Sequence, residues 1–414
     1  MAFYDIIVIG GGPAGLSAVL RADKSGKKTL LIEREGRLGG ILKQCIHDGF
    51  GVIRFGEKLS GPEYAERFTA LLKSSNVQVS LWSFVTDIQH KEEDGFTVTY
   101  LCRDGVKQAQ CKKIILATGC RERTRNQIFV QGDRGAGVFT AGTAQNLVNL
   151  EGVMPGRKCV ILGSGDIGLI MARRLTLEGA TVEGVYEAKS TPSGLPRNIH
   201  QCLEDFNIPL HLSTTVTRVL GDRRVEAVEI CQVDNQMRPV KGTERIVDCD
   251  CLILAVGLIP ENEIATALGV QLDKRTKGPL VDQNLETMRT GIFCCGNALH
   301  VNDLVDYVSE SGETAADGSC SERSGRCLID IVADKAFSYN VPQKININDR
   351  RDKTILYFRS ADIVTDKKVA VYVDGNCVFS KKFLHLSPPE MQRITVDFSS
   401  ATSRKSRIEL RMED

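Results

Sequence analysis

Short apolar runs alternate with amphipathic stretches along most of the chain, and their order occurs twice. A run that is apolar throughout predicts a buried strand, and apolar positions three or four residues apart predict a helix. The first copy predicts a strand, a helix and a strand at residues 3–9, 16–25 and 28–32. The second predicts the same elements at residues 158–162, from a glycine-rich turn to about residue 178, and at residues 181–186. This order is typical of an α/β fold.

Each copy continues into segments in which apolar and polar residues alternate, as in a β-meander. These segments are residues 85–90, 96–103 and 106–111 in the first copy and residues 215–220, 225–233 and 244–247 in the second. Each copy then closes on an apolar run, residues 113–117 and 251–256, that leads into a glycine. Two complete copies in one order indicate an internal repeat.

Other segments lie outside the two copies. Residues 61–72 predict a helix with one apolar face, formed by Tyr64, Phe68, Leu71 and Leu72. Residues 317–327 are polar and predict a loop or a helix break. After about residue 341 the pattern predicts strands only, at residues 354–359, 368–373, 377–384, 392–398 and 406–412. A small all-β domain of the sandwich type is therefore expected at the C-terminal end.

The turn of the first copy carries glycines at the spacing G-x-G-x-x-G. Gly10 permits a tight turn, Gly12 lets the backbone approach a pyrophosphate, and Gly15 lets the helix pack closely on the strand. The helix N-terminus then offers N–H groups and a positive dipole end to phosphates. Glu33 ends the next strand, where an acid binds a ribose hydroxyl. The first copy therefore predicts a dinucleotide site.

The second copy repeats this chemistry with Gly163, Gly165, Gly168 and Glu187. Two dinucleotide sites in one chain predict electron exchange between two cofactors. An acid at the second strand end disfavours a 2′-phosphate, so NAD(H) is expected there and NADP(H) is less favoured. Lys189 lies close enough in sequence to weaken that preference.

Composition and charge narrow the class of protein. The 414 residues are 42% hydrophobic and 25% charged, with a formal net charge of +1, so neither nucleic acid nor an anionic membrane is the expected partner. The chain enters its first predicted strand without a leader pattern, and no apolar run has membrane-spanning length, so a cytoplasmic protein is expected. The 14 cysteines include no C-x-x-C and no zinc-like spacing. Most are interpreted as buried free thiols, and no metal site is expected.

Cys45 and His47 are the candidate catalytic residues. They follow the pair Gly39-Gly40, which indicates close approach of the backbone to a ligand. Cys45 is interpreted either as a thiol beside a redox cofactor or as a small packed side chain. His47 is interpreted either as a structural side chain or as a proton donor near neutral pH.

These motifs resemble those of the flavoproteins with two dinucleotide-binding domains, which include thioredoxin reductase and the pyridine nucleotide-disulfide oxidoreductases. The resemblance covers about residues 1–335 and rests on the two glycine motifs with Glu33, Leu116-Ala117-Thr118-Gly119, Leu254-Ala255-Val256-Gly257 with Pro260, and Gly291-Ile292-Phe293-Cys294-Cys295-Gly296-Asn297. It implies two Rossmann-like three-layer ββα domains. The implied boundaries are 1–121 with 258–335 for FAD, 122–257 for NAD(P), and 336–414 for the all-β domain.

The resemblance also implies the residues around each cofactor. For FAD these are Gly10, Gly12, Pro13, Ala14, Gly15, Glu33, Arg34, Gly39, Gly40, Ile41, Cys45, Val85, Thr118, Gly119, Gly296, Asn297 and Val308. For the nicotinamide nucleotide they are Gly163, Gly165, Asp166, Ile167, Gly168, Glu187 and Gly257. Asn297 stands where the family has an aspartate. A helix starting near residue 307 is expected to point its N-terminus at the flavin ring, where its dipole stabilises a reduced, anionic flavin.

A narrower resemblance suggests the partner. Residues 39–51, 193–199 and 300–306 are similar to stretches of bacterial NAD(FAD)-dependent oxidoreductases that are often encoded beside an anaerobic glycerol-3-phosphate dehydrogenase-like flavoprotein and a small cysteine-rich protein. The implied role is an NAD-linked flavin subunit that relays electrons between a partner dehydrogenase and the nicotinamide pool. The partners implied are that flavoprotein and a cysteine-rich iron–sulfur subunit. The all-β domain is expected to dock either to them or to a second copy of the chain, and otherwise to act as a stabilising cap.

The missing second cysteine leaves two other classes open. Dithiol exchange within one chain is not expected, because only Cys45 follows Gly39-Gly40 and the second domain has no C-x-x-C. A stand-alone NADH oxidase or a single-cysteine disulfide reductase of the coenzyme A-disulfide type remains an alternative. A non-catalytic redox sensor or assembly factor is the third.

Overall fold

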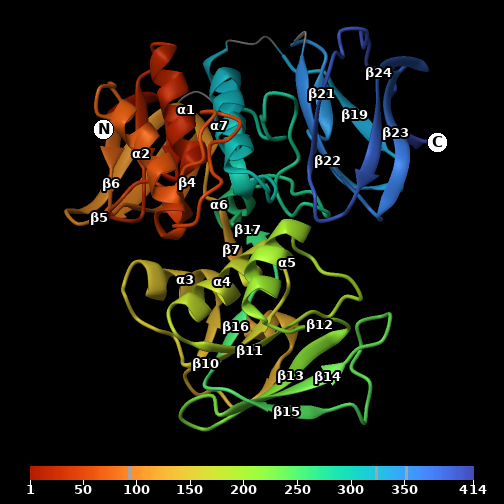
Figure 1. Ribbon diagram of the computed structural model, residues 1–414. Coiled ribbons are helices and arrows are strands. Elements are labelled where there is room, and N and C mark those ends of the chain that lie inside the picture. Colours follow the sequence, from red (N-terminus) through yellow and green to blue (C-terminus); the bar gives the residue numbers. More distant parts are fainter. Residues whose placement is uncertain (92–94, 322–324, 350–352) are drawn as a thin grey trace. The chain divides into compact units, whose positions relative to one another are not determined.

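The computed structural model describes residues 1–91, 95–321, 325–349 and 353–414 (Figure 1). The chain divides into two compact units. Unit 1 comprises Met1–Cys120 and Pro260–Asp414, and unit 2 comprises Arg121–Ile259. The C-terminal strands therefore belong to the same unit as the first glycine motif.

A parallel sheet forms the centre of unit 1. Its strands lie in the order β3-β2-β1-β6, and β18 pairs with the other edge of β6. Their bounds are β1 Ala2–Ile9, β2 Thr29–Ile32, β3 Gln78–Ser80, β6 Gly105–Leu116 and β18 Ile292–Cys294. Ile7 and Val8 in β1 are fully buried, as the apolar run predicts. β18 follows unit 2 in sequence, so the chain returns to complete this sheet.

Strand β6 is continuous where the sequence predicted two strands at residues 106–111 and 113–117. One edge pairs with β1 from Ala109 to Leu116. The other edge pairs antiparallel with β5 as far as Cys111 and parallel with β18 from Ile114. The change of partner alters the burial pattern along β6 without interrupting the backbone. β4 (Phe84–Lys91) and β5 (Gly95–Cys102) complete the meander.

The helices of unit 1 differ from the predicted ones mainly at their ends. Their bounds are α1 Pro13–Lys24, α2 Gly61–Leu72, α6 Glu263–Ala267 and α7 Val305–Cys320, and the short 3₁₀ turns are η1 Gly40–Gln44 and η4 Gly296–Ala298. α1 begins before the predicted residue 16, because Pro13 at its start already has the φ of a helix. On α2 the predicted apolar face is wrong at Leu71, which is 55% exposed.

The predicted loop or break at residues 317–327 is wrong in its first part, where α7 continues to Cys320. Residues 322–324 of that segment lie outside the described residues. α7 lies against α1, as the cyan and red helices in Figure 1 show. Gly312 permits this approach, because a Cβ there would lie 2.1 Å from the Ala14 carbonyl oxygen. The Ser17 hydroxyl on α1 also donates to the Ser309 carbonyl, at 2.8 Å.

Unit 2 repeats the strand arrangement of unit 1. Its parallel sheet has the order β12-β11-β10-β16-β9, and its second sheet the order β15-β14-β13-β8. The strand bounds are β8 Gln131–Gly132, β9 Val138–Thr140, β10 Lys158–Leu162, β11 Thr181–Tyr186, β12 Leu210–His211, β13 Thr214–Leu220, β14 Ala227–Gln232, β15 Arg245–Asp248 and β16 Cys251–Leu254. The short strands β7 Cys120–Glu122 and β17 Leu258–Pro260 contain the residues at which the chain divides into the two units. The helices are η2 Arg125–Ile128, α3 Ala141–Asn149, α4 Asp166–Leu177, α5 Pro196–Cys202 and η3 Glu204–Phe206.

The C-terminal strands form two sheets with one core between them. The orders are β21-β19-β26-β23-β24 and β20-β22-β25. The bounds are β19 Leu328–Ala333, β20 Phe337–Val341, β21 Lys344–Asn346, β22 Thr354–Ser360, β23 Val364–Val373, β24 Asn376–Leu386, β25 Gln392–Val396 and β26 Ile408–Glu413. Leu356 and Phe358 from one sheet share a core with Val371 and Leu410 from the other. The strands begin at Leu328, before the predicted boundary at residue 336, because β19 pairs with β26.

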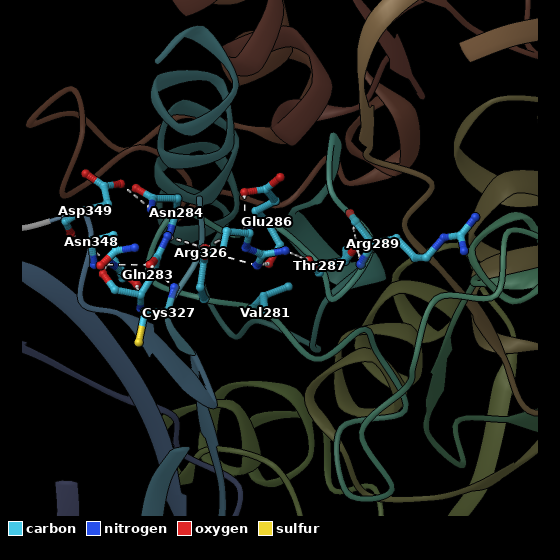
Figure 2. A network of polar contacts seen from close by, with 12 residues as sticks. Val281, Gln283, Asn284, Glu286, Thr287, Arg289, Arg326, Cys327, Asn348 and Asp349 are labelled. Carbon is cyan, nitrogen blue, oxygen red and sulfur yellow. Dashed lines mark hydrogen bonds and ion pairs between the residues drawn. The ribbon is translucent and has the colours of Figure 1, made fainter. Parts of the chain in front are cut away.

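A polar network connects these strands to the loop that precedes β18 (Figure 2). Arg326 pairs with the buried carboxylate of Asp282, at 3.2 Å, and donates to the Thr287 carbonyl, at 2.8 Å. The Gln283 amide donates to the Asn346 carbonyl and accepts from its N–H, at 2.8 and 2.7 Å. Most of these groups are buried, so each partner satisfies a polar atom that water does not reach.

Candidate functional site

The first glycine loop has a backbone that only glycine fits. Gly10 has φ +107°, and a Cβ there would lie 2.3 Å from the Ala117 carbonyl oxygen at the end of β6. A Cβ on Gly15 would lie 1.8 Å from the Gly10 carbonyl oxygen. Both distances are far below van der Waals contact, so the loop is pressed between β1, β6 and the first turn of α1.

Glu33 lies beneath this loop at the end of β2. It is 6% exposed. One carboxylate oxygen accepts from the Gly11 N–H at 2.6 Å, and the other accepts from the Glu35 N–H at 2.8 Å. The carboxylate therefore holds the backbone of the loop, a role that the sequence did not predict.

The start of α1 carries no side-chain cap among the described residues, and Gly12 is the N-cap. Gly39 donates its N–H to the Gly11 carbonyl at 2.8 Å, and a Cβ on Gly40 would lie 3.0 Å from the Gly12 Cα. The Gly39-Gly40 pair thus brings η1 against the loop. Pro13 and Ala14 begin the helix.

The second loop reproduces the first in its backbone contacts. Gly163 has φ +105°, and a Cβ there would lie 2.2 Å from the Ala255 carbonyl oxygen. A Cβ on Gly168 would lie 2.4 Å from the Gly163 carbonyl oxygen. Glu187 is 7% exposed and accepts from the Ser164 N–H at 3.0 Å and from the Lys189 N–H at 3.0 Å. Unit 2 thus holds its acid under its loop in the same way as unit 1.

Asp166 has a partner that the sequence did not reveal. Its carboxylate accepts from the Leu195 N–H at 2.9 Å and from the Asn198 side chain at 2.7 Å. The Ser193 N–H donates to the Ser164 hydroxyl at 2.9 Å. Residues 193–198 are therefore held against the start of α4. The neighbouring candidate Ile167 is partly exposed at the same helix end.

Gly296 places η4 between α1 and α7. Its φ is +62°, and a Cβ there would lie 2.8 Å from the Ala14 Cβ and 3.3 Å from a Val308 methyl group. The Gly296 N–H donates to the Ser311 hydroxyl at 2.8 Å. The predicted FAD-binding residues Ala14, Gly296 and Val308 therefore meet at one place. α7 starts at Val305, earlier than the predicted residue 307.

Three further predicted FAD-binding residues make hydrogen bonds within unit 1. They are Asn297, Thr118 and Gly119. The Asn297 side chain accepts from the Asn302 N–H at 3.1 Å. The Thr118 hydroxyl donates to the Glu261 carbonyl at 2.7 Å, and the Gly119 carbonyl accepts from the Glu261 N–H at 2.9 Å. Arg34 pairs with the Glu261 carboxylate at 3.3 Å. In unit 2, the Gly257 carbonyl accepts from the Arg123 N–H at 3.0 Å.

The two catalytic candidates have different environments. The Cys45 thiol donates to the Ile41 carbonyl at 3.3 Å, and burial raises the pKa of this thiol to about 12. Such a thiol is protonated at neutral pH. Of the two interpretations of Cys45, this favours the packed side chain over the reactive thiol. The His47 ring packs against Phe50 in a tilted arrangement, with ring centroids 4.9 Å apart. Val85 is buried in the core of unit 1.

Sequence reasoning missed a group of buried polar atoms that follows Asn297. Among the described residues, both ring nitrogens of His300 and one side-chain oxygen each of Asn302 and Asp306 are buried without a hydrogen-bond partner. Burial and the nearby Arg359 lower the pKa of His300 to about 3. In the sequence, only the family resemblance of residues 300–306 drew attention to this segment, and that resemblance assigned no function to these side chains.

These features fit a dinucleotide in each unit. Each loop has a glycine at the helix N-cap, Gly12 or Gly165, where a phosphate can approach the backbone. Each has a buried acid at the adjoining strand end. In unit 1 the unpartnered polar atoms of residues 300–306 follow the η4 turn that contacts α1 at Ala14. Buried polar groups normally have partners, so this group is what a polar ligand would complete.

Comparison with known proteins decides the family. The sequence profile of the pyridine nucleotide-disulphide oxidoreductases matches residues 4–316, most of the chain. The chain belongs to this family. It is an FAD-containing, NAD(P)H-dependent oxidoreductase, and the prediction of FAD and a nicotinamide nucleotide as cofactors is confirmed.

Several relatives of this pyridine nucleotide-disulphide oxidoreductase are similar over the same region. An opine oxidase subunit of Agrobacterium tumefaciens (strain Ach5) is 25% identical over 71% of this chain and 61% of its own length. Thioredoxin reductase of Listeria innocua is 24% identical over 77% of this chain and 93% of its own length. The chain thus spans less than two thirds of that opine oxidase protein.

A solved structure shows the same fold. The crystal structure of T. acidophilum thioredoxin reductase has a TM-score of 0.64 and 22% identity, and the match covers 77% of this chain and 98% of that one. The predicted α/β class with two Rossmann-like domains and a C-terminal β region is confirmed. None of the helices in the described ranges combines the length and the apolar character needed to span a bilayer.

Proposed function

We propose that this protein is the NAD(H)-linked flavin component of a larger oxidoreductase. FAD held by unit 1 exchanges a hydride with NAD(H) held by unit 2, and the electrons pass to or from a partner dehydrogenase. The observation that carries the proposal is the duplicated loop with its buried acid, in a chain that has no C-x-x-C. Two nucleotide sites without a dithiol favour an electron acceptor outside the chain.

In this proposal, the residues of the chain bind the two nucleotides and orient them. Gly12 and Gly165 let phosphates approach the starts of α1 and α4, and Glu33 and Glu187 accept ribose hydroxyls beside the N–H groups they already hold. FAD, when bound, supplies the two-electron chemistry that accepts or returns the hydride. Arg34 and Asn297 are further contacts proposed for FAD.

The nicotinamide nucleotide is proposed to be NAD(H). The Glu187 carboxylate is buried and holds Ser164 and Lys189 by their backbone N–H groups. A second anion, the 2′-phosphate of NADP(H), would meet this carboxylate at the ribose position. The matching measurement is the ratio of kcat/KM for NADH and NADPH, which should favour NADH and fall in Glu187→Gln.

The partner is proposed from two observations. The Cys45 thiol is held protonated by burial, which weakens the alternative of a single-cysteine disulfide reductase. One relative is named as an opine oxidase subunit, and so as one component of an oxidase built from several chains. A flavoprotein dehydrogenase and a cysteine-rich iron–sulfur protein are the proposed partners here.

Two experiments test the proposal. Anaerobic titration of the FAD-loaded protein with NADH should bleach the flavin at one equivalent, and flavin that stays oxidised would contradict hydride exchange. Purification of the tagged chain from its native host should recover a dehydrogenase with flavin or iron–sulfur absorption. Recovery of the chain alone, with rapid NADH turnover by oxygen or coenzyme A disulfide, would instead support the stand-alone enzyme.

A further inference from the structure

The C-terminal β-domain contacts the segment that leads into α7. The sheet β20-β22-β25 contributes Tyr339, Tyr357, Arg359 and Arg393 to this contact. Their partners lie between His300 and Glu310. The sequence left the role of this domain open between docking, dimerisation and a stabilising cap.

One set of contacts holds Glu310 in the second turn of α7. Arg393 donates to both carboxylate oxygens, at 2.8 and 2.6 Å, and the Tyr357 hydroxyl donates to one of them at 2.6 Å. A bidentate arginine with a third donor fixes the orientation of a carboxylate as well as its position. The Tyr307 ring also packs near Tyr357, with centroids 5.8 Å apart.

A second set holds Asp303, just before α7. Arg359 forms an ion pair with one carboxylate oxygen of Asp303, and the Met391 N–H donates to the other at 2.6 Å. Arg359 is itself oriented by the Tyr339 hydroxyl, at 2.9 Å. The side chain of Arg359 is 14% exposed and that of Asp303 is 31% exposed, so the pair is partly shielded from water and salt.

The segment between these carboxylates contains the unpartnered polar atoms. His300 is 1% exposed, and its ring lies near the rings of Tyr339 and Tyr357, at centroid distances of 5.9 and 5.4 Å. Asp306 is 6% exposed, with one carboxylate oxygen unpartnered among the described residues. α7 meets α1 at Ala14, so its first turns lie beside the loop that holds FAD.

We propose that the C-terminal β-domain is part of the flavin site and sets the position of the first turns of α7 through Arg359 and Arg393. These arginines are positioning residues that act through Asp303 and Glu310. The inference rests on the proposed binding of FAD by unit 1, with the N-terminus of α7 facing the flavin ring as the family resemblance implies. Its consequence is that loosening either arginine moves a helix dipole end and polar atoms away from FAD.

The experiment compares Arg393→Gln and Arg359→Gln with a matched control, Arg411→Gln. Arg411 lies in the same domain on the other sheet, where it pairs with Glu409 at 2.6 Å and packs on the ring of Tyr372. It therefore makes a similar arginine–carboxylate–tyrosine group away from α7. The readouts are the dissociation constant of FAD from the apoprotein, the visible circular dichroism of bound FAD and the flavin midpoint potential.

Both clamp variants, Arg393→Gln and Arg359→Gln, should raise the FAD dissociation constant by about tenfold, and the control should stay within about twofold. The circular dichroism of FAD should change, and the midpoint potential should fall because the helix dipole stabilises the reduced flavin less. If the clamp variants lose thermal stability but keep the affinity, spectrum and potential of the control, the domain is only a cap and the inference is wrong.

A second, smaller substitution tests the inference if Arg393→Gln does not fold. Tyr357→Phe removes one hydroxyl and keeps the ring in place, and it should raise the FAD dissociation constant by about threefold. An unchanged constant would overturn the inference. All of these readouts use FAD without NADH, so failure of NADH to reduce the flavin would contradict the proposed function and leave this test standing.

Discussion

At the scale of single residues, the environment decides chemistry that residue type leaves open. Cys45 follows a glycine pair that lies beside the first glycine loop, and the sequence allows either a redox thiol or a packed side chain there. Burial raises the pKa of the thiol to about 12, and the thiol donates to the Ile41 carbonyl at 3.3 Å. A raised pKa favours the neutral form, so the thiol stays protonated throughout the neutral range.

Cys45→Ala should therefore leave the flavin spectrum unchanged. A thiolate beside oxidised FAD would add a long-wavelength absorption band that grows as the thiol deprotonates. We expect no such band between about pH 6 and 9 in either the wild-type protein or the variant, since the pKa lies well above that range. A band that titrates in the wild-type protein and disappears in Cys45→Ala would restore Cys45 as a catalytic residue.

His300 should make stability depend on pH. Its pKa is lowered to about 3 in the folded protein, whereas an unfolded histidine has a pKa of about 6.5. Between these values the unfolded state binds the additional proton, so acid favours unfolding. The contribution to the free energy of unfolding should fall by about 1.4 kcal/mol for each pH unit below 6.5.

The measurement is urea unfolding of the FAD-loaded protein from pH 8 to pH 4.5. His300→Phe should lose less stability than wild type as the pH falls, because it has no group to protonate. Replacement of the exposed His385 by glutamine is the control and should follow the wild-type curve. Parallel curves for wild type and His300→Phe would contradict the burial of a neutral imidazole.

At the scale of elements, the two strand–turn–helix motifs contain glycines that packing requires and glycines that have free space beside them. Gly15 and Gly168 are packing positions, because a Cβ there would meet a backbone oxygen at 1.8 and 2.4 Å. Gly12 and Gly165 differ. A Cβ on Gly12 would come no closer than 3.9 Å, and one on Gly165 would meet no described atom within 4 Å.

Gly12→Ala and Gly165→Ala should therefore fold but bind their ligands poorly. The added methyl group faces the space where the pyrophosphate approaches the helix start. Gly165→Ala should retain FAD and raise the dissociation constant of NADH by about tenfold, whereas Gly12→Ala should weaken FAD binding by a similar factor. Titration of each ligand, with circular dichroism to verify folding, checks this. Wild-type affinities in both variants would place the phosphates elsewhere.

At the scale of the whole chain, the C-terminal β-domain belongs to unit 1 through buried polar contacts. Arg326 is central among them, because it faces Asp282, whose side chain is fully buried, and lies 3.7 Å from Glu286 (Figure 2). Burial raises the pKa of Asp282, and Arg326 opposes that rise. Loss of the arginine would leave a buried carboxylate without its cation.

Arg326→Met should lower the free energy of unfolding of unit 1 by about 3–5 kcal/mol at neutral pH. The deficit should shrink in acid, because the raised pKa of Asp282 lets the folded variant take up a proton before the unfolded chain does. Chemical unfolding at several pH values measures this. The control is Arg289→Met, an exposed arginine whose side chain points away from the network (Figure 2). Equal stabilities of the two variants would contradict the role of Arg326.

The sequence by itself determined the parts of the protein whose physics is local. These parts include a positive φ at Gly10, a buried strand at residues 3–9 and an acid at the end of β2. Each depends on a few neighbouring residues, so the sequence pattern predicted it in both copies of the repeat. The repeat, the prediction of two nucleotide sites and the lack of a C-x-x-C followed directly.

Only the tertiary structure decided what depends on segments far apart in the chain. Strand β6 is continuous because its edge changes partner from β5 to β18, and β18 lies beyond unit 2 in sequence. Asp166 holds residues 193–198, and Arg393 holds Glu310, through pairings that no local pattern encodes. Burial of His300 likewise arises from packing against Tyr339 and Tyr357, which lie far from it in the chain, and that burial is the main cause of its lowered pKa.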